Sequence, residues 1–214
     1  LDRVARQASF PFLAANVFRA GTQEHAYRPS VMLEREVGGR TVRIGVTAVT
    51  PPGVLIWDRD HVRGRLDFRE VVASVRPVVA ELRARGADVV VVASHGGLEG
   101  SSYDPAATGV PVENAVAALA REVPGVDVIL MGHTHREVAD TTINGVLVQQ
   151  AKNWAASLAV AELRLQAEAG GPWRVVSKRG TLLRPTRAHA DARLTAALAG
   201  AHERTRAYVT RVLG

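Results

Sequence analysis

The first two thirds of the chain alternate between apolar runs and stretches with helical periodicity. Residues 41–49, 87–94 and 126–131 are predicted strands, and 87–94 is too continuously apolar for a strand with one face in water. Residues 68–85 carry valine and leucine at helical spacing, and residues 113–122 form a second predicted helix. The order strand, helix, strand, helix, strand predicts an α/β fold with buried, mostly parallel strands and flanking helices.

The pattern changes after residue 140. Asn144-Gly145 lies between two β-prone runs, which is the strongest short signal for a hairpin. Two more strands, near 157–165 and 173–183, are predicted to be antiparallel. After Pro185 the chain is rich in alanine, arginine and leucine and is expected to be helical up to Val212.

Three histidines follow two of the predicted buried strands. His95 comes directly after 87–94, while His133 and His135 come after 126–131. Side chains at i and i+2 of an extended backbone point to the same side, and ligands of open α/β sheets bind beyond the carboxyl ends of the strands. One histidine at a strand end is usually a hydrogen-bonded structural residue, but three that converge favour a metal or phosphate site.

The composition limits which side chains could bind a metal and which kinds of partner are expected. The chain has no cysteine, so a transition metal would have to be held by His, Asp, Glu or Asn. The net charge of +6 comes almost entirely from arginines that are scattered, without a basic run or interleaved aromatics. A phosphate-bearing substrate fits this charge, whereas specific nucleic-acid binding is not expected. No apolar run is long enough for a membrane span.

Two motifs make the sequence similar to a known family. Gly132-His133-Thr134-His135 and Ser94-His95-Gly96-Gly97, each after an apolar strand, resemble the calcineurin-like metallophosphoesterases. The resemblance is to their nucleotidase branch, which includes 5′-nucleotidases and 2′,3′-cyclic-nucleotide 2′-phosphodiesterases/3′-nucleotidases. It runs from about Phe10 to about Pro185, and Pro51-Pro52-Gly53 with Trp57-Asp58 is more like the cyclic-phosphodiesterase type.

This resemblance implies a layered metallophosphoesterase-type fold and a two-metal phosphoesterase acting on a small nucleotide. His95 and His133 would bind one divalent ion and His135 the other, with zinc, manganese or iron as the suitable metals. Members of the branch are commonly exported, so the resemblance implies a periplasmic or extracellular location.

Several further residues near the histidines are weaker candidates. Arg136 could meet phosphate. Glu113 and Asn114 are expected to cap the second helix, with Asn114 as a possible support for a metal ligand. Trp57 and Trp154 could flank a nucleoside, although packing is the usual role of isolated tryptophans.

The chain departs from the family pattern at its start. The Asp-x-His pair, the bridging Asp and the Asn-His pair that the family carries upstream are absent, and with them the histidine that protonates the leaving group. We therefore expect residues 1–185 to be a partial catalytic domain and 186–214 a linker helix toward an absent C-terminal substrate domain. The isolated chain is expected to bind metal weakly and to be inactive or nearly so. The alternative is a non-catalytic binding module that has lost half of the metal site.

Overall fold

The computed structural model describes residues 2–167, 171–186 and 191–211. The chain divides into two compact units, Leu1–Leu183 and Arg184–Gly214. Within the described part of the second unit there is one helix, α7 (Ala192–Val209), none of whose residues is buried. A helix in this tail was predicted and is present, but Val212 lies outside the described residues. That the two units are a partial catalytic domain and a linker stays a prediction.

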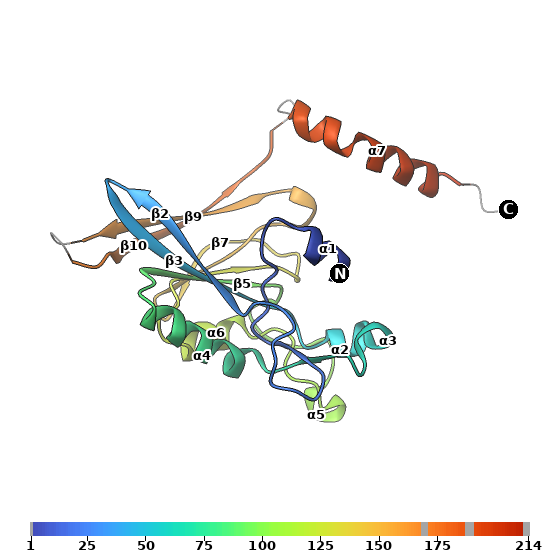
Figure 1. The fold of residues 1–214 in the computed structure, drawn as a ribbon, viewed down its shortest axis with the longest axis horizontal. Coiled ribbons are helices and arrows are strands. Elements are labelled where there is room, and N and C mark those ends of the chain that lie inside the picture. The colour runs from blue at the N-terminus through green and yellow to red at the C-terminus, as the bar shows by residue number, and fades with distance from the viewer. Residues whose placement is uncertain (1, 168–170, 187–190, 212–214) are drawn as a thin grey trace. The chain divides into compact units, whose positions relative to one another are not determined.

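A six-stranded sheet forms the centre of the first unit (Figure 1). Its strands, in spatial order, are β2 (Ser30–Val37), β3 (Arg40–Val49), β5 (Val89–Ser94), β6 (Val128–Met131), β8 (Val146–Gln150) and β7 (Val138–Ile143). The four inner strands are parallel, and the two edge strands pair antiparallel to their neighbours. The predicted α/β class with mostly parallel buried strands is confirmed.

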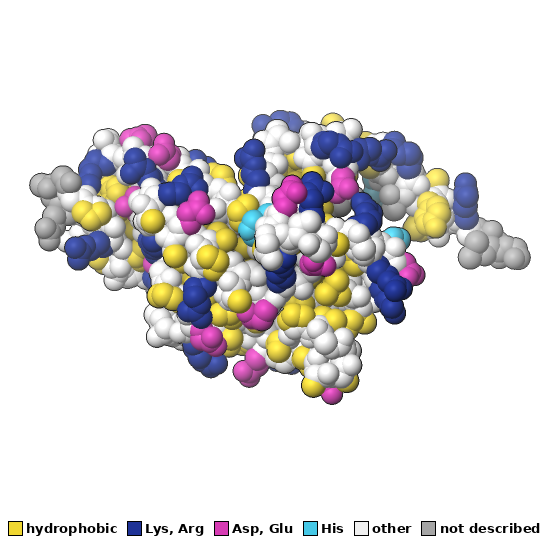
Figure 2. Space-filling model, turned by 60° about the horizontal axis from the view of Figure 1, so that its bottom comes forward, with side chains coloured by type: hydrophobic (Ala, Val, Ile, Leu, Met, Phe, Trp, Pro, Cys, Tyr) yellow, Lys and Arg dark blue, Asp and Glu magenta, His cyan; other side chains and the backbone are white. Residues whose placement is uncertain are grey.

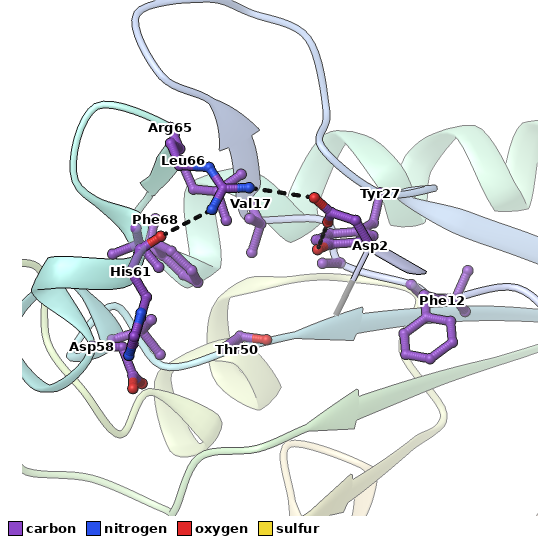
Figure 3. A pocket seen from close by; sticks show the side chains of 14 residues that line it. Asp2, Phe12, Val17, Tyr27, Thr50, Asp58, His61, Arg65, Leu66 and Phe68 are labelled. Carbon is purple, nitrogen blue, oxygen red and sulfur yellow. Dashed lines mark hydrogen bonds and ion pairs between the residues drawn. The ribbon is translucent and has the colours of Figure 1, made fainter. Parts of the chain in front are cut away.

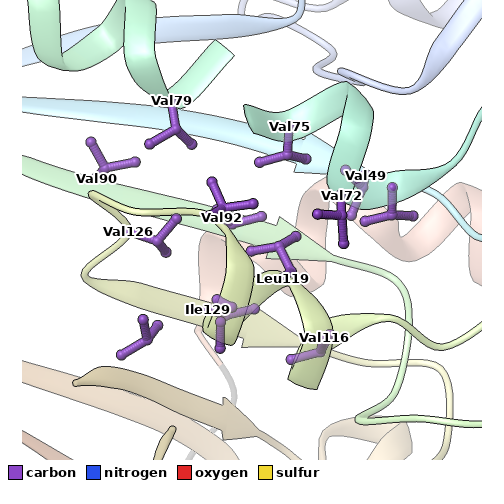
Figure 4. Close-up of a cluster of buried hydrophobic side chains, with 14 of the residues drawn as sticks. Val49, Val72, Val75, Val79, Val90, Val92, Val116, Leu119, Val126 and Ile129 are labelled. Atoms are coloured by element: carbon purple, nitrogen blue, oxygen red, sulfur yellow. The ribbon is translucent and has the colours of Figure 1, made fainter. Parts of the chain in front are cut away.

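Two helices cover one face of this sheet, α4 (Val71–Ala84) and α6 (Val116–Glu122). Figure 4 shows their valines and leucines packed against the inner strands. The pair Val75 and Leu119, both fully buried, faces Val90, Val92 and Ile129. Apolar side chains of β5 and β6 are buried beneath these helices, whereas Ala93 of β5 and Leu130 of β6 are exposed.

Both predicted helices start later than the sequence suggested. Phe68 belongs to the short strand β4 (Leu66–Phe68), and Glu70 caps α4 by accepting hydrogen bonds from the N–H groups of its first turn. The helix α6 begins at Val116 with Ala115 at the cap position, so the prediction that Glu113 and Asn114 cap it is wrong. Those two polar side chains are used elsewhere.

The hairpin of β9 (Leu158–Gln166) and β10 (Arg174–Leu183) packs against the other face, over β7 and β8. Both it and the predicted hairpin at Asn144-Gly145 are confirmed, and the positive φ of Asn144 and Gly145 fits a two-residue turn. The fully buried Gln149 donates its amide to backbone oxygens of Ala139 and Val160, which joins the hairpin to the sheet.

Shorter elements complete the first unit, and neither they nor the edge strand β2 were predicted. They are α1 (Asp2–Gln7), β1 (Val17–Arg19), α2 (Val54–Trp57), α3 (Arg59–Val62), α5 (Pro105–Thr108) and the single 3₁₀ turn η1 (Asn153–Ala155). The strand β1 pairs with β4, and a second small core that includes Val17, Val62 and Phe68 lies beneath them. These segments are too short for a periodic pattern to show in the sequence.

The surface carries no single basic stripe on the face that Figure 2 shows, where arginines and lysines are interspersed with acidic and apolar side chains. Among the described helices, none combines the length and the apolarity that crossing a bilayer requires.

Candidate functional site

The structure brings the predicted histidines to one edge of the sheet. Ser94 and Met131, the last residues of β5 and β6, are paired in register, and His95 and His133 follow them. The ring centroids of His95 and His133 are 5.2 Å apart. His135 is close enough to act on the charge of His95. The carboxyl ends of two parallel strands thus bring His95 and His133 together, with His135 nearby.

The backbone around the histidine pair is not the extended strand that the sequence suggested. His133 and His135 have φ angles of 71° and 56°, in the left-handed region that non-glycine residues rarely adopt. Thr134 between them donates its hydroxyl to Gln150 and packs so closely on Gly97 that a Cβ there would lie 2.4 Å from its methyl group. Tertiary contacts of this kind hold the strained loop in place.

Glu113 fixes the orientation of His133. The ring Nε2 of His133 lies 2.6 Å from a carboxylate oxygen of Glu113, whose side chain is 6% exposed. Burial raises the pKa of Glu113, but hydrogen bonds from the Ser102 hydroxyl, the Ser102 N–H and His133 outweigh it and lower the pKa. An ionised carboxylate only accepts hydrogen bonds, so Nε2 carries a proton, and Nδ1 is the ring nitrogen that Glu113 does not occupy.

Asn114 supports the loop that follows His95. Its side-chain oxygen accepts a hydrogen bond from the Gly97 N–H at 2.6 Å, and its amide donates to the Gly100 carbonyl at 3.1 Å. The side chain therefore acts on the backbone near His95. Glu113, which sequence reasoning treated chiefly as a helix cap, is the residue that touches a histidine.

The pKa of His95 favours a neutral ring, whose lone pair can bind a metal ion or accept a hydrogen bond. Burial, and then the neighbouring His133 and His135, lower the pKa of His95 below the ordinary histidine value. A neutral imidazole keeps the lone pair that coordination needs. Within residues 2–167, 171–186 and 191–211, however, no three His, Cys, Asp or Glu side chains form a group that could hold a metal ion.

Two tryptophans lie beside the histidines. Trp57 is 45% exposed, packs 5.4 Å from the His133 ring and meets Tyr103 edge-on, in line with the packing role expected for it. Trp154 is 94% exposed and its ring lies 6.4 Å from that of His135, so the expectation of packing is wrong there.

A cavity of about 510 Å³ adjoins His133 and includes Arg136. Glu113, Asn114 and Gln150 also line it, and the side-chain nitrogen of Gln150 has no hydrogen-bond partner. The weak candidate Arg136 therefore lines a cavity on the histidine side of the sheet.

A second cavity, of about 560 Å³, lies between β1, β4, α2 and α3 and is lined by none of the three histidines (Figure 3). Its wall includes aromatic side chains such as Phe12 and Phe68. Asp2 closes one side, where its carboxylate accepts a hydrogen bond from the Tyr27 hydroxyl at 3.3 Å and meets Arg65 at 3.4 Å.

Several known proteins similar in sequence to this chain are named as nucleotide phosphoesterases. No family model matches it. A 2′,3′-cyclic-nucleotide 2′-phosphodiesterase/3′-nucleotidase of Haemophilus influenzae is 32% identical over 98% of the chain and 35% of its own length. The trifunctional nucleotide phosphoesterase protein YfkN of Bacillus subtilis is 30% identical over 85% of the chain and 13% of its own length. The chain thus spans about a third or less of these relatives.

Solved structures agree. The calcineurin-like phosphoesterase YfkN of Bacillus subtilis superposes with a TM-score of 0.86 and 27% identity, over 98% of this chain and 67% of that one. A 5′-nucleotidase precursor of Thermus thermophilus gives a TM-score of 0.71 at 24% identity, over 99% of this chain and 41% of that one, which shows a shared fold. The resemblance inferred from the two histidine motifs is confirmed.

Proposed function

We propose that this chain is part of a nucleotide phosphoester hydrolase. It is homologous to 2′,3′-cyclic-nucleotide phosphodiesterases/3′-nucleotidases and has the fold of a calcineurin-like phosphoesterase. Its substrate class is a 2′,3′-cyclic nucleotide or a 3′- or 5′-nucleotide. The observation that carries the proposal is the convergence of His95, His133 and His135 beyond β5 and β6.

The donor set fits one half of a two-metal centre. The lowered pKa of His95 favours its neutral form, and Glu113 occupies Nε2 of His133, so that Nδ1 is the nitrogen available to a metal. His95 and His133 would share one divalent ion of the zinc, manganese or iron type, and His135 would bind the other. Two such ions supply an activated water and stabilise the attacking and leaving oxygens at phosphorus.

The residues of this chain have supporting tasks around that centre. Glu113 orients the His133 ring, and Asn114 holds the Gly97–Gly100 backbone beside His95. Arg136, which lines the adjoining cavity, would bind a phosphate oxygen. The histidine that protonates the leaving group is expected in sequence upstream of these residues.

We propose further that residues 1–214 alone bind metal weakly and hydrolyse phosphoesters little or not at all. Three histidines that serve two ions make a poor single site, and the described residues contain no metal-holding group of three. The full gene product would add the upstream ligands and a C-terminal substrate domain. An exported protein, periplasmic or extracellular, is the location that fits this proposal.

The experiment compares residues 1–214 with the full-length gene product. Each is given manganese and, in separate assays, a 2′,3′-cyclic nucleotide, a 3′-nucleotide and a 5′-nucleotide, and phosphate ester hydrolysis and bound metal are measured with His133→Ala controls. We expect about two ions and His133-dependent hydrolysis in the full-length protein, and neither in residues 1–214. Hydrolysis by residues 1–214 above the control would refute the claim of inactivity.

The same experiment distinguishes the alternative of a non-catalytic binding module. That alternative is favoured by the lack of a metal-holding group among the described residues. A full-length protein that binds no metal and hydrolyses none of the nucleotide classes would support the binding module and overturn the enzyme.

A further inference from the structure

Trp154 has an unusual setting for a large aromatic side chain. It lies in η1, directly after β8, and 94% of its surface is exposed. Trp154 and Ala155 both have positive φ angles, 57° and 55°. Bulky residues rarely adopt this conformation, and strained backbone of this kind gathers at ligand clamps.

The turn that presents Trp154 is held from both sides. The Lys152 N–H donates to the buried hydroxyl of Ser157 at 2.8 Å, and the Ala156 N–H donates to the Asn153 carbonyl at 3.2 Å. The backbone thus keeps the indole in solvent and away from the core. A tryptophan selected only for packing would have its ring in the core.

The position of the indole relative to the histidines indicates an occupant. Its ring lies 6.4 Å from the ring of His135, at an interplanar angle of 51°. If the histidines held the phosphate group of a phosphoester, the alcohol part of that molecule would be within reach of the Trp154 indole. An exposed π face next to a phosphate site suits a flat, uncharged aromatic group, which in a nucleotide is the base.

We propose that Trp154 is a stacking platform for the nucleobase of the substrate, and so a residue that sets the preference for nucleotides over other phosphoesters. This inference rests on the proposed function, because a phosphate held at the histidines places the base of the same substrate beside this ring. Stacking is tolerant of base identity, so Trp154 would favour any nucleobase over none.

Adenosine binding tests the stacking without any hydrolysis. The full-length gene product is titrated calorimetrically with adenosine, and with ribose as the ligand without a base. The variants are Trp154→Ala, Trp154→Phe and, as a matched loss of an exposed aromatic, Tyr208→Ala. We expect Trp154→Ala to weaken adenosine binding about tenfold, Trp154→Phe to keep most of it, and Tyr208→Ala to leave it unchanged. Ribose binding should not respond to any variant.

Equal adenosine affinity in the wild type and Trp154→Ala, or no adenosine binding by the wild type, would overturn the stacking role. An indole covered by another segment of the polypeptide would give that result. Hydrolysis of a cyclic nucleotide is measured on the same samples. Trp154-dependent adenosine binding without hydrolysis would mean that the proposed function is wrong while the platform stands, and hydrolysis with unaltered adenosine binding would mean the reverse.

Discussion

At the scale of single residues, the site depends on a contact between side chains 20 positions apart. Glu113 has few polar alternatives once it is buried, and its carboxylate meets the His133 Nε2 and two hydrogen-bond donors of Ser102. A carboxylate on the outer nitrogen of a histidine fixes the ring and raises the basicity of the other nitrogen. The orientation of His133 is therefore set before any ligand binds.

Replacing Glu113 with Gln should weaken metal binding by the full-length protein about 10- to 100-fold, because the neutral amide no longer orients His133 as a charged acceptor. Competition with a metal chelator measures the affinity. Glu122→Gln, which neutralises an exposed carboxylate on α6, is the control and should have no effect. Equal affinities in the two variants would show that Glu113 does not position His133.

At the scale of elements, one carboxylate joins three parts of the fold. Asp127, just before β6, accepts hydrogen bonds from the Val90 N–H of β5 and from Arg83 of α4. Its other oxygen lies 3.4 Å from the ammonium group of Lys178 on β10. The sheet, its covering helix and the β9–β10 hairpin thus share an ionic contact that is largely shielded from water.

Asp127→Ala should lower the free energy of unfolding by about 3 kcal/mol, since it removes the carboxylate that meets Arg83, Lys178 and the Val90 N–H and leaves both cations with backbone carbonyls alone. Urea unfolding of residues 1–214 measures the change. Glu34→Ala removes a carboxylate from an exposed pair with Arg43 and should cost less than about 1 kcal/mol. If both variants lowered the free energy of unfolding by the same small amount, Asp127 would not stabilise the contact between sheet, helix and hairpin.

At the scale of the whole molecule, the two units differ in how much apolar surface each buries within itself. The first contains the sheet, both core clusters and the candidate site, whereas α7 in the second has no buried residue. The apolar burial that stabilises a folded domain is thus found in the first unit.

A chain ending at Leu183 should accordingly keep a cooperative thermal transition, with a midpoint within about 2 °C of that of residues 1–214. Circular dichroism at a β-sheet wavelength would follow it. A shortened chain that fails to fold, or melts far below the longer one, would show that residues after 183 are needed for the stability of the first unit.

The sequence by itself determined the α/β class, the inner strands β3, β5 and β6, and the place of the three histidines. Their signals are local: apolar continuity in 87–94, helical spacing in 71–82, and histidines directly after strands whose ends must meet at one edge. Helix starts were less accurate, because the cap of α4 and the irregular entry to α6 depend on individual contacts.

The tertiary structure alone decided how the site is built. Glu113 meets His133 only because the loop before α6 folds against the end of β6, and the left-handed backbone at His133 and His135 is held by neighbours far along the chain. The exposure of Trp154 likewise follows from a strained turn, which has no periodic signature. Periodicity reports which face of an element is apolar, whereas such pairings depend on which loops the finished fold brings together.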